Sequence, residues 1–180
     1  MDMLGAWSPW YNQPDPPRPY GDQTTYRIAE QWLAGLPVED WGCGYAWFKT
    51  IHDGDYLGID GTPGYADIVQ DLTERRSETP GLLLRHVLDH NVDWYDILTN
   101  AADSCTHTMV VILFVPPTRD DTTTLVGWNR QLGVPDLALP HDTIADYCPQ
   151  WVDYVTDTQY KTERVYVRRR HDPGPVPGHR

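Results

Sequence analysis

Residues 38–48 read VEDWGCGYAWF, a pattern that predicts a short strand, a glycine-rich turn and the start of a helix. The strand delivers the carboxylate of Asp40 just before the turn. Gly42 and Gly44 predict that the turn is tight, and because glycine has no side chain, a ligand can approach the backbone closely there. The helix expected over residues 45–51 would direct unpaired N–H groups toward an anionic part of that ligand. The stretch therefore predicts a ligand site where the strand ends.

Two further expected strands also carry an acidic residue, one at its last position and the other directly after it. The strand expected over residues 56–60 ends in Asp60, about 20 residues after the turn, where a carboxylate can accept hydrogen bonds from ribose hydroxyls. Gly61 keeps the rim of the site open. The strand expected over residues 67–70 leads into Asp71, which can accept a hydrogen bond from an adenine amino group. Three successive strands placed in this way predict a nucleoside site.

The rest of the chain alternates helical and strand patterns. We expect helices over residues 24–34, 93–105 and 142–147, and strands over residues 81–85, 109–115, 151–156 and 164–168. Strands that alternate with helices predict a mostly parallel sheet in three layers, here closed by an antiparallel hairpin of the last two strands. Residues 116–140, which contain Pro135 and Pro140, are expected to be a loop. No insert dedicated to a second substrate is predicted there.

The composition limits the possible partners and compartments. The 180 residues contain 14 Lys and Arg against 26 Asp and Glu, a formal net charge of −12 that argues against nucleic acid and favours a cationic or neutral small ligand. Three cysteines, at 43, 105 and 148, are too scattered for a disulfide framework or a paired-cysteine zinc site. No apolar stretch is long enough to cross a membrane, and the first residues do not resemble a signal peptide. We therefore expect a cytoplasmic protein that does not bind membranes.

The segments EDWGCGYAWF, YLGIDG, DIVQDLT and LLLRHVLDHN together resemble the class I S-adenosylmethionine-dependent methyltransferases, over roughly residues 20–170. The first motif of that family is an acidic residue followed by three glycines at alternate positions. Asp40, Gly42 and Gly44 match it, and Ala46 stands in place of the third glycine. The resemblance implies an α/β fold of the Rossmann-like type, a three-layer sandwich around a mostly parallel seven-stranded sheet with an antiparallel edge hairpin. It also implies S-adenosylmethionine as methyl donor and predicts no metal.

The resemblance also implies which residues bind the cofactor. These are Asp40, Gly42, Cys43, Gly44, Asp60, Gly61, Asp71, Leu72 and Arg85. In this interpretation Asp60 binds the ribose, Asp71 lies near the adenine and Leu72 beside its ring. Arg85 could hold the carboxylate of the cofactor, or it could form an ion pair with one of the many acidic residues. The chain departs from the family in two respects: Ala46 replaces the third glycine, and the 11-residue interval from Asp60 to Asp71 is too short for the usual helix.

Two histidines are the candidates for catalysis. His86 and His90 are four residues apart, so on a helix they would share a face. Either could act as general base for a hydroxyl acceptor, although ordinary packing or capping roles remain open. No third ligand accompanies them, so no metal site is predicted. In many members of the family a segment before the first helix folds over the donor, which makes Tyr20, Asp22 and Tyr26 candidates for substrate binding.

These expectations describe one domain over residues 20–170, preceded by an irregular arm rich in aromatic residues and proline (1–19) and followed by a flexible tail (171–180). The predicted function is methyl transfer from S-adenosylmethionine to a hydroxyl of a small molecule or sugar. A non-catalytic binding or scaffold protein of the same fold stays open, as does a methyltransferase acting on protein or nucleic acid. A dinucleotide dehydrogenase is disfavoured, because the turn lacks the third glycine that pyrophosphate sites use. The sequence leaves the oligomeric state open.

Overall fold

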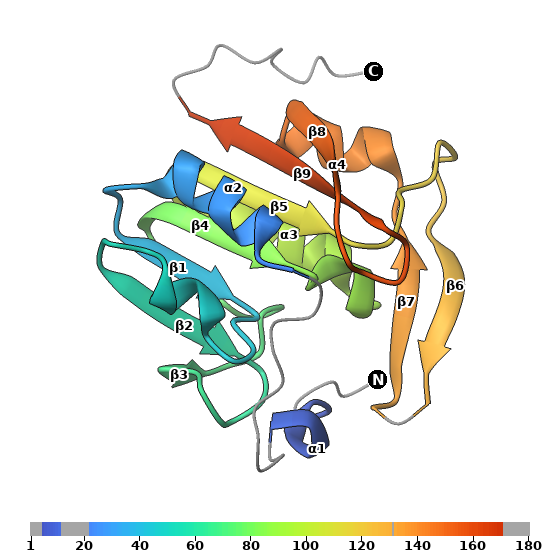
Figure 1. Cartoon of the computed structure of the whole chain (residues 1–180), viewed down its shortest axis with the longest axis horizontal. Coiled ribbons are helices and arrows are strands. Elements are labelled where there is room, and N and C mark those ends of the chain that lie inside the picture. The colour runs from blue at the N-terminus through green and yellow to red at the C-terminus, as the bar shows by residue number, and fades with distance from the viewer. Residues whose placement is uncertain (1–4, 12–21, 131, 171–180) are drawn as a thin grey trace.

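The computed structural model of the chain describes residues 5–11, 22–130 and 132–170. A seven-stranded sheet lies at its centre, in the order β3-β2-β1-β4-β5-β9-β8 (Figure 1). Its strands are β1 (Val38–Trp41), β2 (Tyr56–Asp60), β3 (Ile68–Val69), β4 (Thr79–Arg85), β5 (Cys105–Leu113), β8 (Gln150–Val155) and β9 (Thr162–Arg169). The first five strands pair in parallel, whereas β9 runs antiparallel to β5 and β8. The mostly parallel sheet with an antiparallel edge hairpin is therefore confirmed.

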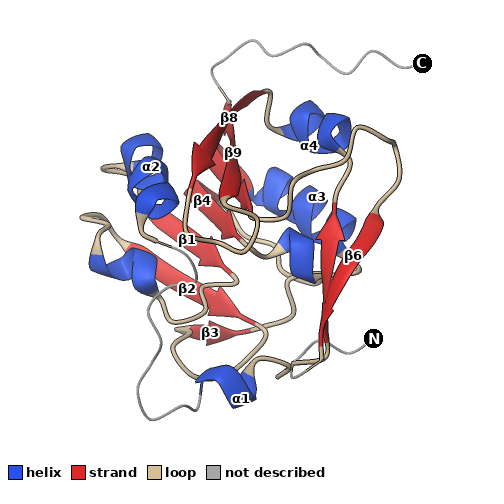
Figure 2. Ribbon diagram, turned by 45° about the vertical axis from the view of Figure 1, so that its right-hand side comes forward, coloured by secondary structure: helices blue, strands red, loops and turns tan. Residues whose placement is uncertain are grey.

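Helices cover both faces of the sheet and make the three expected layers (Figure 2). On one face, α2 (Thr24–Leu33) packs on side chains such as Leu83 and Val110. On the other face, α3 (Trp94–Ser104) and α4 (His141–Tyr147) pack on neighbours such as Leu84 and Val111. Successive strand residues point to opposite faces, so a central parallel strand must be apolar throughout to be covered on both. This explains the apolar run of β5.

The expectation that residues 116–140 form a loop is wrong. The segment is not one continuous loop. It contains a separate antiparallel hairpin, formed by β6 (Thr124–Asn129) and β7 (Val134–Ala138). Pro135 is compatible with this hairpin because both strands of a two-stranded sheet are edges, where a missing backbone N–H costs little. The hairpin stands beyond the carboxyl ends of the parallel strands (Figures 1 and 2).

Two other local expectations also need correction. The helix expected over residues 45–51 is only the 3-10 turn η1 (Trp47–Thr50), because Ala46 adopts a left-handed conformation with φ 54°. In the arm that we expected to be irregular, residues 8–11 form one helical turn, α1 (Ser8–Tyr11). Pro9 lies in the first turn of α1, where proline is tolerated. The prolines that motivated the expectation, from Pro14 onward, lie outside the described residues.

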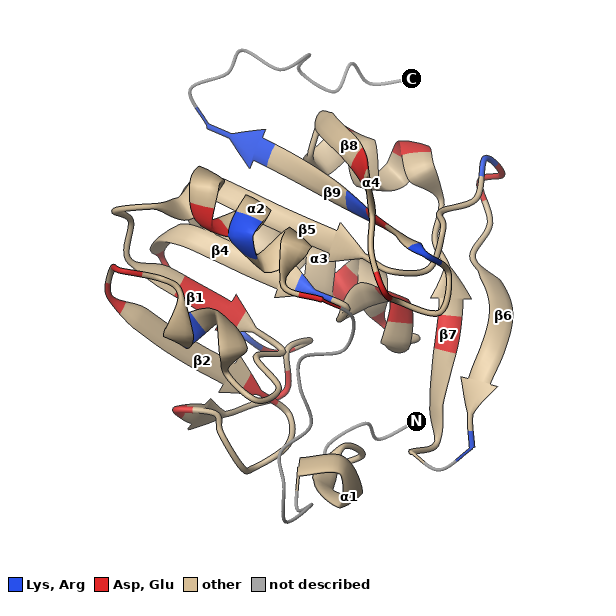
Figure 3. Ribbon diagram, in the orientation of Figure 1, with Lys and Arg blue, Asp and Glu red and all other residues tan. Residues whose placement is uncertain are grey.

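The interval from Asp60 to Asp71 contains no helix, as its length predicted, and β3 follows β2 directly through a loop. None of the described helices is both long enough and apolar enough to span a bilayer. Acidic residues are spread over helices, strands and loops, whereas basic residues are fewer and include a group at the end of β9 (Figure 3). The proposed boundaries of the domain adjoin residues 12–21 and 171–180, which lie outside the described part, so the division into arm, domain and tail remains a proposal.

Candidate active site

A cavity of about 410 Å³ opens beyond the carboxyl ends of β1, β2 and β4. It brings together most of the residues that the sequence predicted for the site. Its lining includes Tyr26, Gly42, Cys43, Gly44, Asp60, Gly61, Asp71, Leu72, Arg85, His86 and His90. Asp40 and Asp22 do not line it, and Tyr20 lies outside the described residues.

The glycine turn forms the floor of the cavity. Gly42 has a φ of 76°, and a Cβ added there would lie 2.3 Å from Cγ2 of Val87. Both the backbone conformation and the space therefore require glycine at this position. The N–H groups of Gly42 and Cys43 donate to the carbonyl oxygen of Ile59, at 2.7 and 3.1 Å. These bonds fix the turn against the end of β2, and they leave neither N–H group pointing at a ligand.

Asp60 is held in place by three hydrogen bonds. Its Oδ2 accepts from the N–H of Gly44 at 3.0 Å and from the hydroxyl of Tyr11 at 3.3 Å, and its Oδ1 accepts from the N–H of Thr62 at 2.8 Å. Burial raises the pKa of this carboxyl, and the two backbone N–H groups act in the opposite direction. The result is a fixed acceptor at the end of β2, whose hydroxyl partner comes from α1.

Asp71 and Leu72 follow β3 and line the cavity together with Asp60, which ends the neighbouring strand β2. Oδ1 of Asp71 accepts from both the N–H and the hydroxyl of Thr73, each at 2.8 Å, which orients the carboxylate. Leu72 is buried and presents an apolar surface beside it. Of the three acidic residues that were expected around a nucleoside, Asp60 and Asp71 therefore line one cavity, whereas Asp40 does not.

Asp40 lies beneath the turn. Its Oδ2 accepts a hydrogen bond from the hydroxyl of Tyr56 at 2.9 Å. Burial raises the pKa of the Asp40 carboxyl to about 7, because no water solvates its charge. This position suits a residue that supports the turn from below.

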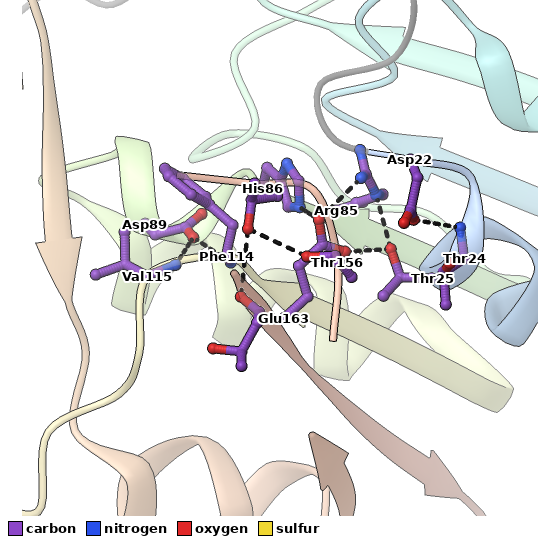
Figure 4. A network of polar contacts seen from close by, with 12 residues as sticks. Asp22, Thr24, Thr25, Arg85, His86, Asp89, Phe114, Val115, Thr156 and Glu163 are labelled. Atoms are coloured by element: carbon purple, nitrogen blue, oxygen red, sulfur yellow. Dashed lines mark hydrogen bonds and ion pairs between the residues drawn. The ribbon is translucent and has the colours of Figure 1, made fainter. Parts of the chain in front are cut away.

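Arg85 is the centre of a buried polar network at the back of the cavity (Figure 4). Its Nη2 donates to Oε1 of Glu163 at 3.1 Å, and its Nε donates to the hydroxyl of Thr25 at 3.1 Å. The guanidinium also lies over the ring of Tyr26, 4.2 Å from its centre. Thr25 hydrogen-bonds Glu163 in turn. The ion pair that the sequence left open for Arg85 therefore exists, and its partner is Glu163 on β9.

His86 belongs to this network. Its Nε2 lies 3.0 Å from Oε1 of Glu163, and its backbone has a left-handed φ of 57°. Burial, together with the nearby Arg85 charge, lowers the pKa of His86 to about 3. Burial alone would raise the pKa of Glu163, but the contact with His86 and the Arg85 charge outweigh it and hold that pKa below its usual value. A histidine so hard to protonate is a weak base.

His90 stands in a different environment, at the end of the 3-10 turn η2 (Leu88–His90). Its Nδ1 lies 2.9 Å from the carbonyl oxygen of Pro135 and 3.4 Å from Oδ1 of Asp136. Its ring meets that of Trp7 edge-on, with 5.2 Å between the ring centres. Because His86 precedes this turn in a left-handed conformation, the two histidines do not share a helix face as the sequence predicted.

Asp22 accepts a hydrogen bond from the N–H of Thr24 at 2.8 Å, at the start of α2 (Figure 4). This bond holds the Asp22 side chain at the start of the helix, outside the cavity lining. Tyr26, in the first turn of α2, lines the cavity.

Several lining residues were missed in the sequence. The hairpin contributes Trp128, Asn129, Leu132 and Asp136, and Gln159 lies on the turn between β8 and β9. The β-branched run that leads into β6 was a signal for a strand, but the prolines of the segment outweighed it in our interpretation. The contact of His90 with β7 joins residues far apart in the chain and has no local signal.

No protein-family model matches the sequence, and no curated protein matches it either. Several solved structures resemble the chain in fold. The N-methyltransferase NodS from Bradyrhizobium japonicum, in complex with S-adenosyl-L-homocysteine, superposes with a TM-score of 0.66 at 11% identity, over 94% of this chain and 98% of that one. Magnesium protoporphyrin IX methyltransferase from Synechocystis, with bound S-adenosylmethionine, gives 0.56 at 15% identity, over 81% and 77%.

An S-adenosylmethionine-dependent methyltransferase from Mesorhizobium loti also gives a TM-score of 0.56, at 14% identity, over 82% of this chain and 96% of that one. The chain therefore has the fold of the class I S-adenosylmethionine-dependent methyltransferases, as the sequence motifs implied. At these identities the likeness concerns the fold.

Proposed function

We propose that this chain transfers a methyl group from S-adenosylmethionine to a hydroxyl of a small molecule, with a sugar as one possible acceptor class. The observation that carries the proposal is the fixed carboxylate of Asp60 beside a glycine turn that no larger residue could form. A carboxylate at the end of the second strand is the group that accepts hydrogen bonds from ribose hydroxyls. The fold neighbours that hold this donor or its product support the same assignment.

The residues present fit the donor. The cavity volume of about 410 Å³ lies in the range of about 300–1,000 Å³ that small ligands and cofactors occupy. Asp60 would hold the ribose, and Asp71 with Leu72 would hold the adenine. The floor and rim of the cavity would stay open for the donor, because they are formed by Gly42, Cys43, Gly44 and Gly61. The donor supplies an activated methyl group on a sulfonium sulfur, so the protein has mainly to orient the acceptor and exclude water.

The opposite end of the donor would lie toward Tyr26 and Arg85. The ion pair with Glu163 holds Arg85 in one position, which suits a residue that binds a carboxylate, and Asp40 supports the floor from below. For a hydroxyl acceptor a general base is also needed. We assign that role to His90 rather than His86, because burial makes His86 a weak base. The excess of acidic residues favours a neutral or cationic small acceptor over a nucleic acid.

Isothermal titration with S-adenosylmethionine tests the donor site. Asp60→Asn removes the charge that accepts the ribose hydroxyls, and hydrogen bonds to a charged group are worth about 1.5–3 kcal/mol, so we expect binding to weaken at least tenfold. Asp120→Asn makes the same charge change on the exposed loop before the hairpin, outside the cavity, and should bind within about threefold of the parent. Circular dichroism checks that both variants fold. Absence of binding by the folded parent at millimolar donor would refute the proposed function, and equal binding by both variants would refute the assignment of Asp60.

A further inference from the structure

We propose that the acceptor is an aromatic hydroxyl compound, a phenol, that binds between α1 and the β6–β7 hairpin, where His90 removes its proton and Asp136 positions His90. The inference rests on the proposed function, because it assigns the part of the same cavity that lies beside His90 and the hairpin. It adds an acceptor class, a catalytic base and a positioning residue.

The walls of this part of the cavity are aromatic and apolar. They are formed by Trp7 just before α1, Phe114 after β5, and Trp128 and Leu132 of the hairpin segment. The His90 ring lies against two of them, with its centre 5.2 Å from that of Trp7 and 5.0 Å from that of Phe114. Flat rings pack well in such surroundings, by stacked or edge-on contacts. A planar aromatic acceptor therefore suits the walls.

The hydrogen bonding of His90 fixes which nitrogen can accept a proton. A carbonyl oxygen only accepts hydrogen bonds, so Nδ1 must carry the hydrogen in its 2.9 Å contact with Pro135. In the neutral ring, Nε2 is then the nitrogen with a lone pair. A histidine whose second nitrogen is held in this way is the usual arrangement of a general base.

Asp136 stabilises the charge that His90 acquires when it accepts a proton. Its Oδ1 lies 3.4 Å from Nδ1, and its side chain is mostly buried. The carboxylate lies close to residue 127, its partner across the hairpin: a Cβ on Gly127 would lie 2.8 Å from Oδ2 of Asp136, so a larger residue there would move the carboxylate. The other titratable groups that act on His90 are Asp89, on its own turn, and His86.

The chemistry of the base favours a phenol over an alcohol. An imidazole has a pKa of about 6.5, a phenol about 10, and water, to which an aliphatic hydroxyl is comparable, about 15.7. Proton transfer to His90 is therefore far less unfavourable from a phenol. In the step, the O–H bond breaks as Nε2 takes the proton, and the phenolic oxygen forms a bond to the methyl carbon. The carbon–sulfur bond breaks and its electron pair stays on sulfur, which gives the methyl ether, S-adenosylhomocysteine and protonated His90.

Three probes with S-adenosylmethionine carrying a labelled methyl group test the acceptor class. 2-Naphthol is an aromatic hydroxyl, 2-naphthylmethanol carries an aliphatic hydroxyl on the same rings, and methyl β-D-glucoside is a sugar. We expect both naphthalene probes to quench tryptophan fluorescence of the protein saturated with S-adenosylhomocysteine, but 2-naphthol to be methylated at least 100-fold faster. The glucoside should do neither. Comparable methylation of 2-naphthylmethanol or the glucoside would overturn the proposal.

Asp136→Asn and Gly127→Ala test the positioning of His90, the second by displacing the carboxylate without removing it. With either variant we expect the rate of 2-naphthol methylation at pH 7 to fall about tenfold, while 2-naphthol binding changes little. The acidic limb of the pH–rate profile should move to lower pH, because loss of the nearby negative charge lets His90 give up its proton more readily. Asp120→Asn, a matched charge change on the exposed loop before the hairpin, should leave both unchanged.

The outcomes separate this inference from the proposed function. If the protein binds S-adenosylmethionine but neither binds nor methylates 2-naphthol, the phenol site is wrong and the donor site stands. If Asp136→Asn and Gly127→Ala leave the rate and the pH profile as in the parent, Asp136 does not position the base. If the donor itself fails to bind, both conclusions fall.

Discussion

Gly42 shows how one residue couples the turn to the rest of the cavity floor. Its left-handed φ of 76° is one that residues with side chains adopt with strain, and the space where a Cβ would lie is filled by Val87. Val87 follows β4, so the position joins the turn after β1 to the strand beside it. The glycine pattern that identified the site in the sequence thus has a structural cause at this residue.

Replacing Gly42 by alanine should lower the free energy of unfolding by about 2–4 kcal/mol, because it adds both backbone strain and a clash. Gly35→Ala provides a matched control. Gly35 has a similar φ of 74° but nothing within 4 Å of an added Cβ, so only the strain of about 1 kcal/mol should appear. Urea denaturation measures both. Equal losses in the two variants would show that the contact with Val87 contributes nothing.

Asp40 should make stability depend on pH. In the folded chain its pKa is raised to about 7, from 3.8 in the exposed side chain, so between these values the folded state retains a proton that the unfolded state has lost. The stability that this proton provides is complete below pH 4 and is lost as the pH rises through 7. The side chain of Asp40→Asn stays neutral and can still accept the hydrogen bond from Tyr56. The free energy of unfolding of this variant, relative to that of the parent, should therefore rise by up to about 4 kcal/mol from pH 4 to pH 8. Urea denaturation at pH 4 and pH 8 measures the free energies of unfolding, with Asp120→Asn as control. A difference between Asp40→Asn and the parent that is the same at both pH values would contradict this account.

At the scale of elements, the sequence predicted those helices and strands whose conformation depends mainly on residues nearby in the chain. The strand expected over residues 56–60 coincides with β2, and the helix expected over residues 24–34 nearly coincides with α2. Both are short segments with a clear apolar period. The β6 strand was missed because its mostly exposed residues show no alternation of apolar and polar side chains, so only the β-branched run before it indicates a strand, against the prolines of the segment.

The element α1 illustrates what a sequence pattern does not contain. Several contacts join it to distant parts of the chain: the N–H of Gly5, just before it, donates to the carbonyl of Gly61, and the hydroxyl of Tyr45 donates to the carbonyl of Trp10. Tyr11 donates to Asp60, 49 residues away. Nothing in the local pattern of residues 5–11 indicates that this element lies over the cavity, which becomes apparent only in the folded chain.

At the scale of the whole molecule, the cavity is assembled from nearly the full length of the described chain, from Trp7 to Gln159. The three acidic residues that the sequence singled out come from consecutive parallel strands, and their gathering at one edge follows from the fold class. The acceptor part was not predictable in the same way, because it depends on how α1 and the hairpin approach that edge (Figures 1 and 2). Local spacing carries no information on such contacts.

The most direct test of the account is a crystal structure of the protein with S-adenosylhomocysteine. We expect the ribose hydroxyls within hydrogen-bonding distance of Asp60, the adenine beside Asp71 and Leu72, and the hydroxyl of Tyr11 no longer bonded to Oδ2 of Asp60. Density for the ligand elsewhere on the molecule, or a cavity that stays empty at saturating ligand with Tyr11 still on Asp60, would contradict the donor site and the function derived from it.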